Sequence, residues 1–187
     1  MPVQIGAKAH NFTDPTGLLS DCHRRVEMFL GMLQAVGEVI DQSATRETSR
    51  AALESALRYF GEAAPKHTAD EEDSLFPRLR QLDHPEIHSA FSALDKLECD
   101  HRWAMSLHDK VERLGAQYLS IGKLSDDEIA EFRSSVASLA AMYKEHIRVE
   151  EELIFPMAAR VLSDTEKTAI GIEMAGRRQV KLVTELS

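Results

Sequence analysis

Cysteine is scarce in this chain of 187 residues, and its two cysteines, Cys22 and Cys99, form no C-x-x-C pair. A disulfide framework needs several cysteines, and a thiolate metal cluster needs closely spaced ones. Both are therefore excluded as the basis of the fold. We expect Cys22 and Cys99 to be buried thiols.

An excess of basic charge and long apolar runs are also missing. The chain has 22 Lys and Arg residues against 31 Asp and Glu residues, and its formal net charge is -9. This balance predicts no nucleic acid and no membrane as partner, because both surfaces are negatively charged. The doublet Arg177-Arg178 is too small to reverse it and is expected to be a solvated helix end. With no apolar run near the roughly 18 residues of a membrane span, and no signal-peptide pattern, we expect a soluble, cytoplasmic protein.

Glycine and proline are few, with 9 and 6 residues, and apolar residues recur three and four positions apart. This periodicity predicts an all-α protein, and the length suits a single domain over residues 1–187. Start signals such as Thr13-Asp14-Pro15 and His84-Pro85 mark helix boundaries. We predict an antiparallel up-down four-helix bundle over about 15–160 with a short C-terminal fifth helix over about 164–182. The four long helices are expected at about 15–40, from the segment 43–45 to 76 with a kink at Pro65, at 85–115, and at 126–159.

Each predicted inward stripe is apolar but is interrupted by histidine. Helical spacing places the following residues on those stripes: Leu19, His23, Val26, Leu30 and Leu33; Leu53, Leu57, Phe60, Ala64, His67 and Glu71; Ile87, Leu94, His101 and Met105; and Phe132, Val136, Leu139, Tyr143, His146, Glu150, Leu153 and Met157.

The chain also repeats itself. A shift of 79 residues superposes His67-Thr-Ala-Asp-Glu-Glu-Asp-Ser-Leu-Phe-Pro77 on His146-Ile-Arg-Val-Glu-Glu-Glu-Leu-Ile-Phe-Pro156, and a shift of 78 places His23-Arg24 on His101-Arg102. The sequence therefore resembles two helical hairpins, each with one His on its first helix and an H-x-x-x-E pair on its second. An approximate two-fold axis would bring these side chains together at the bundle centre.

Residues four apart on a helix are neighbours, so each H-x-x-x-E pair offers a nitrogen and a carboxylate on one face. Alone, a histidine on such a stripe is usually a core residue, and such a pair is usually a weak ion pair. Two carboxylates on apolar stripes, however, cost several kcal/mol each when buried unless a cation compensates. Four His and two bridging Glu divide into two equivalent half-sites, and imidazole suits iron, zinc, copper and nickel. The predicted ligands of two metal ions are His23, His67, Glu71, His101, His146 and Glu150.

Other polar residues have weaker claims. Glu27 and Glu98 lie near His23 and His101 in sequence and are either extra ligands or salt-bridge partners. His10, His84 and His88 are expected to be solvated near helix ends, and His108 lies too far along its helix from His101, about 10 Å. Glu72 and Glu151 are rotated away from the predicted ligands, so they either hydrogen-bond a ligand or form a solvated face.

At the segments 21–25, 67–77 and 146–156 the sequence resembles the hemerythrin-like proteins, also called HHE cation-binding domains. The resemblance implies a four-helix bundle with a non-haem di-iron centre that binds oxygen, nitric oxide or a related small molecule. It makes the four histidines nitrogen ligands, and Glu71 and Glu150 bridges. Oxygen-carrying hemerythrins have a further histidine where this chain has Met105. The count of four is similar to that of the iron-centre repair proteins, but their cysteine-containing N-terminal domain is absent.

The predicted function is a metal-binding di-iron protein that binds, senses or reacts with oxygen, nitric oxide or peroxide. The predicted cofactor is two iron ions, with zinc or manganese as substitutes, and the predicted partner is a small diatomic or peroxide ligand. Carrier, sensor and enzyme all fit this ligand set. The alternative is a metal-dependent signalling, iron-homeostasis or iron-centre repair module, with a protein partner or a second copy of the chain.

Overall fold

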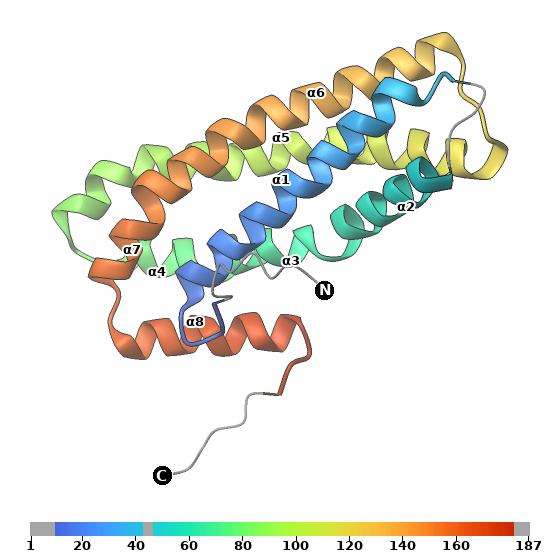
Figure 1. Ribbon diagram of the computed structural model, residues 1–187. Coiled ribbons are helices and arrows are strands. Elements are labelled where there is room, and N and C mark those ends of the chain that lie inside the picture. The colour runs from blue at the N-terminus through green and yellow to red at the C-terminus, as the bar shows by residue number, and fades with distance from the viewer. Residues whose placement is uncertain (1–9, 43–46, 182–187) are drawn as a thin grey trace, which may run out of the picture.

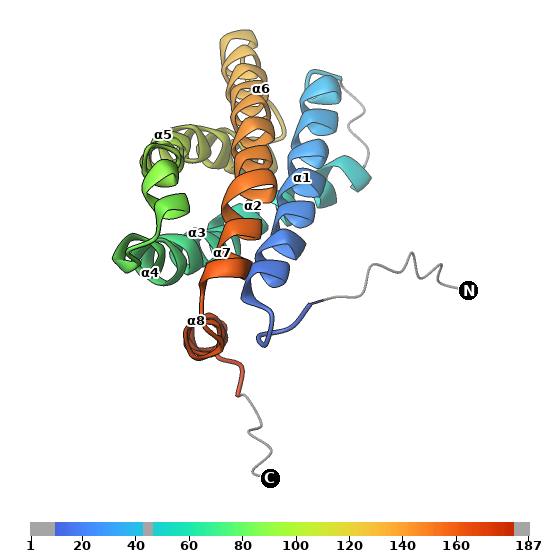
Figure 2. The same ribbon diagram turned by 90° about the vertical axis from the view of Figure 1, so that its left-hand side faces the viewer.

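The computed structural model describes residues 10–42 and 47–181, and every regular element in them is a helix. Four helical columns run alternately up and down as a bundle, and a short helix crosses one end (Figures 1 and 2). The predicted all-α four-helix bundle with a fifth helix is therefore confirmed. The columns are α1 (Pro15–Val39); α2 (Glu47–Glu62), α3 (Ala64–Ala69), η1 (Asp70–Leu75) and α4 (Phe76–Gln81); α5 (Pro85–Ile121); and α6 (Asp126–Val149), η2 (Glu150–Ile154) and α7 (Phe155–Val161). The crossing helix is α8 (Asp164–Arg177).

The helix starts follow local capping rules. The Asp14 side chain accepts a hydrogen bond from the Gly17 backbone N–H, and Pro15 lies in the first turn of α1. Ser125 opens α6 and Ser163 opens α8, each through a reciprocal capping box with a Glu three residues on. These starts match the sequence prediction, although the expected start signal at 43–45 lies outside the described residues. The fifth helix was expected to end near Leu182, but α8 ends at Arg177, just before Gln179 takes a left-handed φ of 56°.

Two predicted ends of the long helices were also wrong. The second column continues to Gln81 rather than ending at 76, and α5 continues to Ile121 rather than ending at Gly115. Gly115 lies inside α5, where an added Cβ would come within 2.8 Å of the Leu57 side chain. The glycine therefore allows α2 to pack closely against α5, and the true end of α5 is Gly122, whose φ of 76° is left-handed.

Each half of the repeat contains one π-helical turn just before its proline. The Phe76 N–H bonds to the Glu71 carbonyl, and the Phe155 N–H bonds to the Glu150 carbonyl, five residues back in both cases. Pro77 and Pro156 follow directly and have no N–H to donate, so the regular α-helical bond is lost at both places. These turns therefore arise from a feature that the repeat carries twice.

The second π turn also corrects one predicted stripe. Strict α-helical spacing put Leu153 on the inward face, but its side chain is 44% exposed, whereas Ile154 is fully buried. The π turn adds a residue to the helical turn and shifts the inward face by one position. Met105, predicted inward on α5, is likewise exposed.

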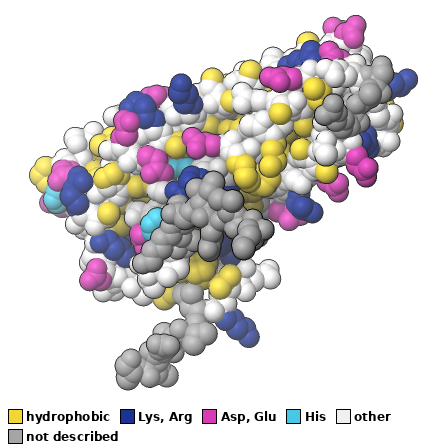
Figure 3. Space-filling view, viewed as in Figure 1, with side chains coloured by type: hydrophobic (Ala, Val, Ile, Leu, Met, Phe, Trp, Pro, Cys, Tyr) yellow, Lys and Arg dark blue, Asp and Glu magenta, His cyan; other side chains and the backbone are white. Residues whose placement is uncertain are grey.

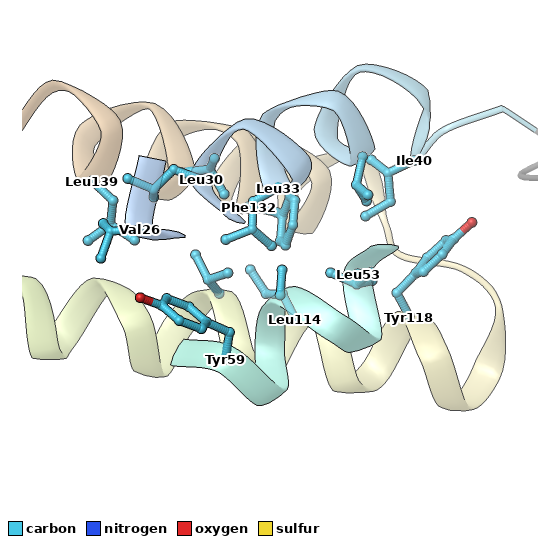
Figure 4. Close-up of a cluster of buried hydrophobic side chains, with 14 of the residues drawn as sticks. Val26, Leu30, Leu33, Ile40, Leu53, Tyr59, Leu114, Tyr118, Phe132 and Leu139 are labelled. Carbon is cyan, nitrogen blue, oxygen red and sulfur yellow. The ribbon is translucent and has the colours of Figure 1, made fainter. Parts of the chain in front are cut away.

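The buried apolar side chains form two clusters along the bundle. The first lies toward the α1–α2 and α5–α6 loops and includes Leu33, Leu53 and Phe132 (Figure 4). The second lies toward α8 and includes Leu19, Phe76 and Ile154. Along α1, His23 falls between Leu19 of the second cluster and Val26 of the first. The predicted polar residues therefore lie between two apolar layers.

Helix α8 is fixed to the bundle by buried charge. Arg177 and Arg178 contact the fully buried carboxylate of Asp70, with N–O distances of 3.0 and 2.6 Å. Glu173 of α8 also accepts hydrogen bonds from Ser74 and Arg78. The prediction that the arginine doublet is a solvated helix end was therefore wrong, because its partner lies about a hundred residues away in sequence.

Charges of both signs are mixed on the surface of the protein. Acidic and basic side chains are interspersed on the face seen in Figure 3. No helix within residues 10–42 and 47–181 is long and apolar enough to cross a membrane. Cys22 is buried as expected, but Cys99 is exposed, so the second cysteine prediction was wrong.

Candidate metal centre

Six side chains from all four columns meet in the middle of the bundle, and they are the six predicted from the repeat. α1 contributes His23, α3 and η1 contribute one His and one Glu, α5 contributes His101, and α6 and η2 contribute the second pair. Every one is at most 6% exposed, and both carboxylates are completely buried: His23, His67, Glu71, His101, His146 and Glu150.

Each carboxylate contacts histidines from both halves of the repeat. Glu71 Oε1 lies 3.2 Å from His67 Nε2, and Glu71 Oε2 lies 3.5 Å from His101 Nε2. Glu150 Oε2 lies 3.2 Å from His146 Nε2 and 3.0 Å from His23 Nε2. Both Glu side chains therefore lie between histidines from the two halves of the repeat.

Most of the donor atoms face one another without a hydrogen bond, although His101 Nε2 and His146 Nε2 lie 3.0 Å apart, within hydrogen-bond distance. All four oxygens of Glu71 and Glu150, and His23 Nε2, are buried without a hydrogen bond. Two donors about 2.1 Å from one metal ion, at right angles, would lie about 3 Å apart, which matches these contacts. Two groups of donor atoms fall within 4.8 Å of one another: Glu71, His101, His146 and Glu150; and His23, His67 and Glu71. The charge of such a buried pair of carboxylates must be compensated, by a bound cation or by protons.

The other ring nitrogens of three of the four histidines lie near acidic side chains, whereas His67 Nδ1 is buried without a hydrogen bond. His23 Nδ1 lies 2.7 Å from Glu151 Oε1, and His101 Nδ1 lies 2.8 Å from Glu72 Oε1. Of the two roles open to these glutamates, the structure shows hydrogen bonding to the histidines. Asp100, which the sequence reasoning missed, lies 3.6 Å from His146 Nδ1. Its place directly before His101 was the one available signal. Such carboxylates hold the imidazoles with Nε2 free to bind a metal.

The pKa values of His23, Glu71 and Glu150 are strongly shifted in the metal-free cluster. Burial favours a lower pKa for His23, but contacts with Glu150 and Glu151 outweigh it and raise that pKa to about 9. Burial and the nearby Glu150 carboxylate raise the pKa of Glu71 well above its usual value. Burial also works to raise the pKa of Glu150, but His146 and His23 hold it below the usual value. Protons therefore neutralise the metal-free cluster, and a bound cation would replace them.

Apolar side chains close the cluster on the side facing α8. The Phe155 ring stacks on His23 with 5.2 Å between centroids. Leu75, Phe76 and Ile154 are fully buried in the same layer. The two π turns lead to these residues, which lie four and five positions after Glu71 and Glu150. The apolar layer restricts access of water to the carboxylates.

The weaker candidates lie elsewhere. Glu98 pairs with Arg80 at 3.0 Å, and Glu27 is exposed. His84 caps α5, and His88 is exposed near Asp83. His10 is exposed as expected, although its backbone N–H and its ring also contact Asp21. His108 hydrogen-bonds Tyr143 at 3.0 Å and is absent from both donor groups.

Comparison with known proteins supports the metal-binding assignment. The model of the family described as "Hemerythrin HHE cation binding domain" matches residues 14–158. A protein of Haemophilus influenzae, described as an uncharacterized protein, is 29% identical over 170 residues, which cover 91% of this chain and 93% of that protein. The family match includes all six residues of the cluster.

Proposed function

The chain belongs to the hemerythrin HHE cation-binding family, and we propose that it is a single-domain di-iron protein that binds, senses or reacts with oxygen, nitric oxide or peroxide. The observation that carries the proposal is the pair of fully buried carboxylates, each in contact with histidines from both halves. His101 and His146 would hold one ion, His23 and His67 the other, and Glu71 and Glu150 would bridge them.

The chain's own residues prepare this site in three ways. Glu72, Glu151 and Asp100 orient three of the imidazoles from outside. Phe155 and the apolar layer around it limit water, which strengthens every charge interaction inside the cluster. At these three rings the acidic partners also favour the tautomer that carries its proton on Nδ1, which leaves the Nε2 lone pair for a metal when the ring is neutral. Bound iron would supply open coordination positions and a reversible change of oxidation state.

A second candidate function is metal-dependent signalling, and the contact between α8 and η1 favours it. Asp70, which holds Arg177 and Arg178, directly precedes the candidate bridge Glu71. Occupancy of the metal site would therefore change the ordering of η1 and the seating of α8 together. Slower amide exchange in α8 on metal addition would support this function. Unchanged exchange there would exclude it.

Metal analysis tests the main proposal directly. Protein purified without oxygen should contain two iron ions per chain, and its absorption spectrum should change on addition of oxygen, nitric oxide or peroxide. Recovery of the original spectrum after removal of the ligand indicates binding or sensing, whereas steady consumption of the ligand with a reductant indicates an enzyme. A reproducible single ion in fully loaded protein would exclude the dinuclear site.

A further inference from the structure

A pocket of about 380 Å³ opens beside the candidate metal centre, between α2–α3, α5 and α6. At its inner end lie His101 and Glu72, which are hydrogen-bonded to each other. Met105 lines its outer part with a side chain that is 65% exposed. The pocket therefore connects solvent to the half-site at the position where oxygen-carrying relatives have an additional histidine.

The pocket combines an apolar wall with a hydrogen-bonded pair of neutral polar side chains, Tyr143 and His108. Phe60, Ala64 and Ala104 form much of the wall. Tyr143 and His108 line the same pocket, and the Tyr143 hydroxyl lies 3.0 Å from His108 Nε2. Burial lowers the pKa of His108 to about 4, so its ring is neutral near pH 7 and can accept the Tyr143 proton. The Tyr143 oxygen then keeps lone pairs for a second, incoming donor.

Charge and size restrict the occupant. Glu72, Asp109 and Glu112 line the pocket against one basic residue, Arg102, so an anion is disfavoured. The volume is also much larger than the roughly 30 Å³ that one water occupies in the liquid. A diatomic molecule would leave most of the pocket and its apolar wall unfilled, whereas a small organic molecule would bury that wall.

We propose that this pocket binds a small uncharged organic molecule that has an apolar body and one hydroxyl or hydroperoxyl end. The body lies against Phe60, Ala64 and Ala104, and the polar end donates to Tyr143 next to His101. The inference depends on the proposed function for one feature only, the metal ion beside that polar end. It extends the proposed function by naming an organic substrate class in addition to diatomic ligands.

Benzyl alcohol is a suitable probe, and benzoate is its anionic counterpart. Each is titrated into the protein as purified and after loading with zinc, with amide chemical shifts as the readout. Benzyl alcohol should give saturable shifts at Thr68, Met105 and their neighbours. Benzoate should bind at least about 10-fold more weakly because of the acidic lining. Tyr143→Phe should weaken benzyl alcohol binding about 3- to 10-fold, the effect of one hydrogen bond.

Two helical glycines provide a matched pair of blocking variants. Gly61 lines the pocket and Gly31 lies on α1, and a Cβ added at either meets no atom within 4 Å. Gly61→Trp should therefore weaken benzyl alcohol binding by at least about 10-fold, while Gly31→Trp should stay within about 2-fold of the parent.

Absence of saturable shifts, shifts confined to another surface, or equal affinity of the two glycine variants would overturn the pocket proposal. The titration measures binding of the probe and not iron chemistry. Its result is therefore independent of the metal analysis. Protein that binds the probe but holds no metal would contradict the proposed function alone. Protein that holds two metal ions but does not bind the probe would contradict the pocket alone.

Discussion

The substitution Glu71→Gln should have opposite effects on the metal-loaded and metal-free protein. In the metal-free cluster, burial and Glu150 raise the pKa of Glu71 well above its usual value, so folding disfavours its ionised form. A neutral amide of the same shape avoids that penalty, and we expect the metal-free protein to gain about 1 to 3 kcal/mol. At roughly 2 to 4 °C per kcal/mol for a chain of this size, its melting temperature should rise by about 2 to 12 °C.

In the loaded protein the same change should be strongly unfavourable, because a bridge supplies a charged oxygen to both ions. We expect metal affinity to fall by more than about 100-fold, beyond the 10- to 100-fold range of outer hydrogen-bonding partners. Chelator competition measures affinity, and calorimetry of the two forms measures stability.

Glu72→Gln is the matched control. Glu72 is the next residue, is about one-third exposed, and contacts only the outer nitrogen of His101. It should lower metal affinity by about 10- to 100-fold and leave metal-free stability within about 0.5 kcal/mol. Equal metal loss from the two variants would mean that the wrong face of this helix has been assigned to the metal. A lower melting temperature for metal-free Glu71→Gln would show that the carboxylate is structural and would refute the argument.

Three further predictions concern pH, the α8 contact and the open position. His23 has a raised pKa of about 9 in the metal-free protein, so its stabilisation is complete below the unfolded value of about 6.5 and is lost as pH rises through 9. Calorimetry of the metal-free protein should show this loss of stability with rising pH, and the His23→Gln variant should not show it. A loss of equal size in both proteins would disprove the role of His23. Arg178→Met should destabilise by about 1 to 3 kcal/mol because it leaves buried Asp70 less well paired, and Asp70→Asn in the same chain should recover part of that; additive effects in denaturant unfolding would exclude the pair. Met105→His should slow the spectral response to oxygen or nitric oxide without lowering metal content, and an unchanged rate in stopped-flow measurements would remove the argument for an open position beside Met105.

The helical class and the candidate cluster were accessible from the sequence because both depend on local spacing. A period of 3.6 residues fixes which side chains share a face, so the apolar stripes and the H-x-x-x-E pairs can be recognised without a partner helix. The shift of 79 residues then paired the two hairpins and placed His67 with His146 and Glu71 with Glu150. Their burial in one cluster agrees with that prediction, while their roles as ligands and bridges stay proposals.

The tertiary structure decided features that depend on contacts between distant segments. Asp70 pairs with Arg177 and Arg178, and Asp100 lies beside His146, although neither pairing follows a helical spacing. Met105 could be placed on α5 from the sequence, but its exposure at a pocket depends on how three columns pack. Helical spacing describes one helix at a time, whereas the partner of a buried charge and the shape of a cavity are set by which helices meet and at what register.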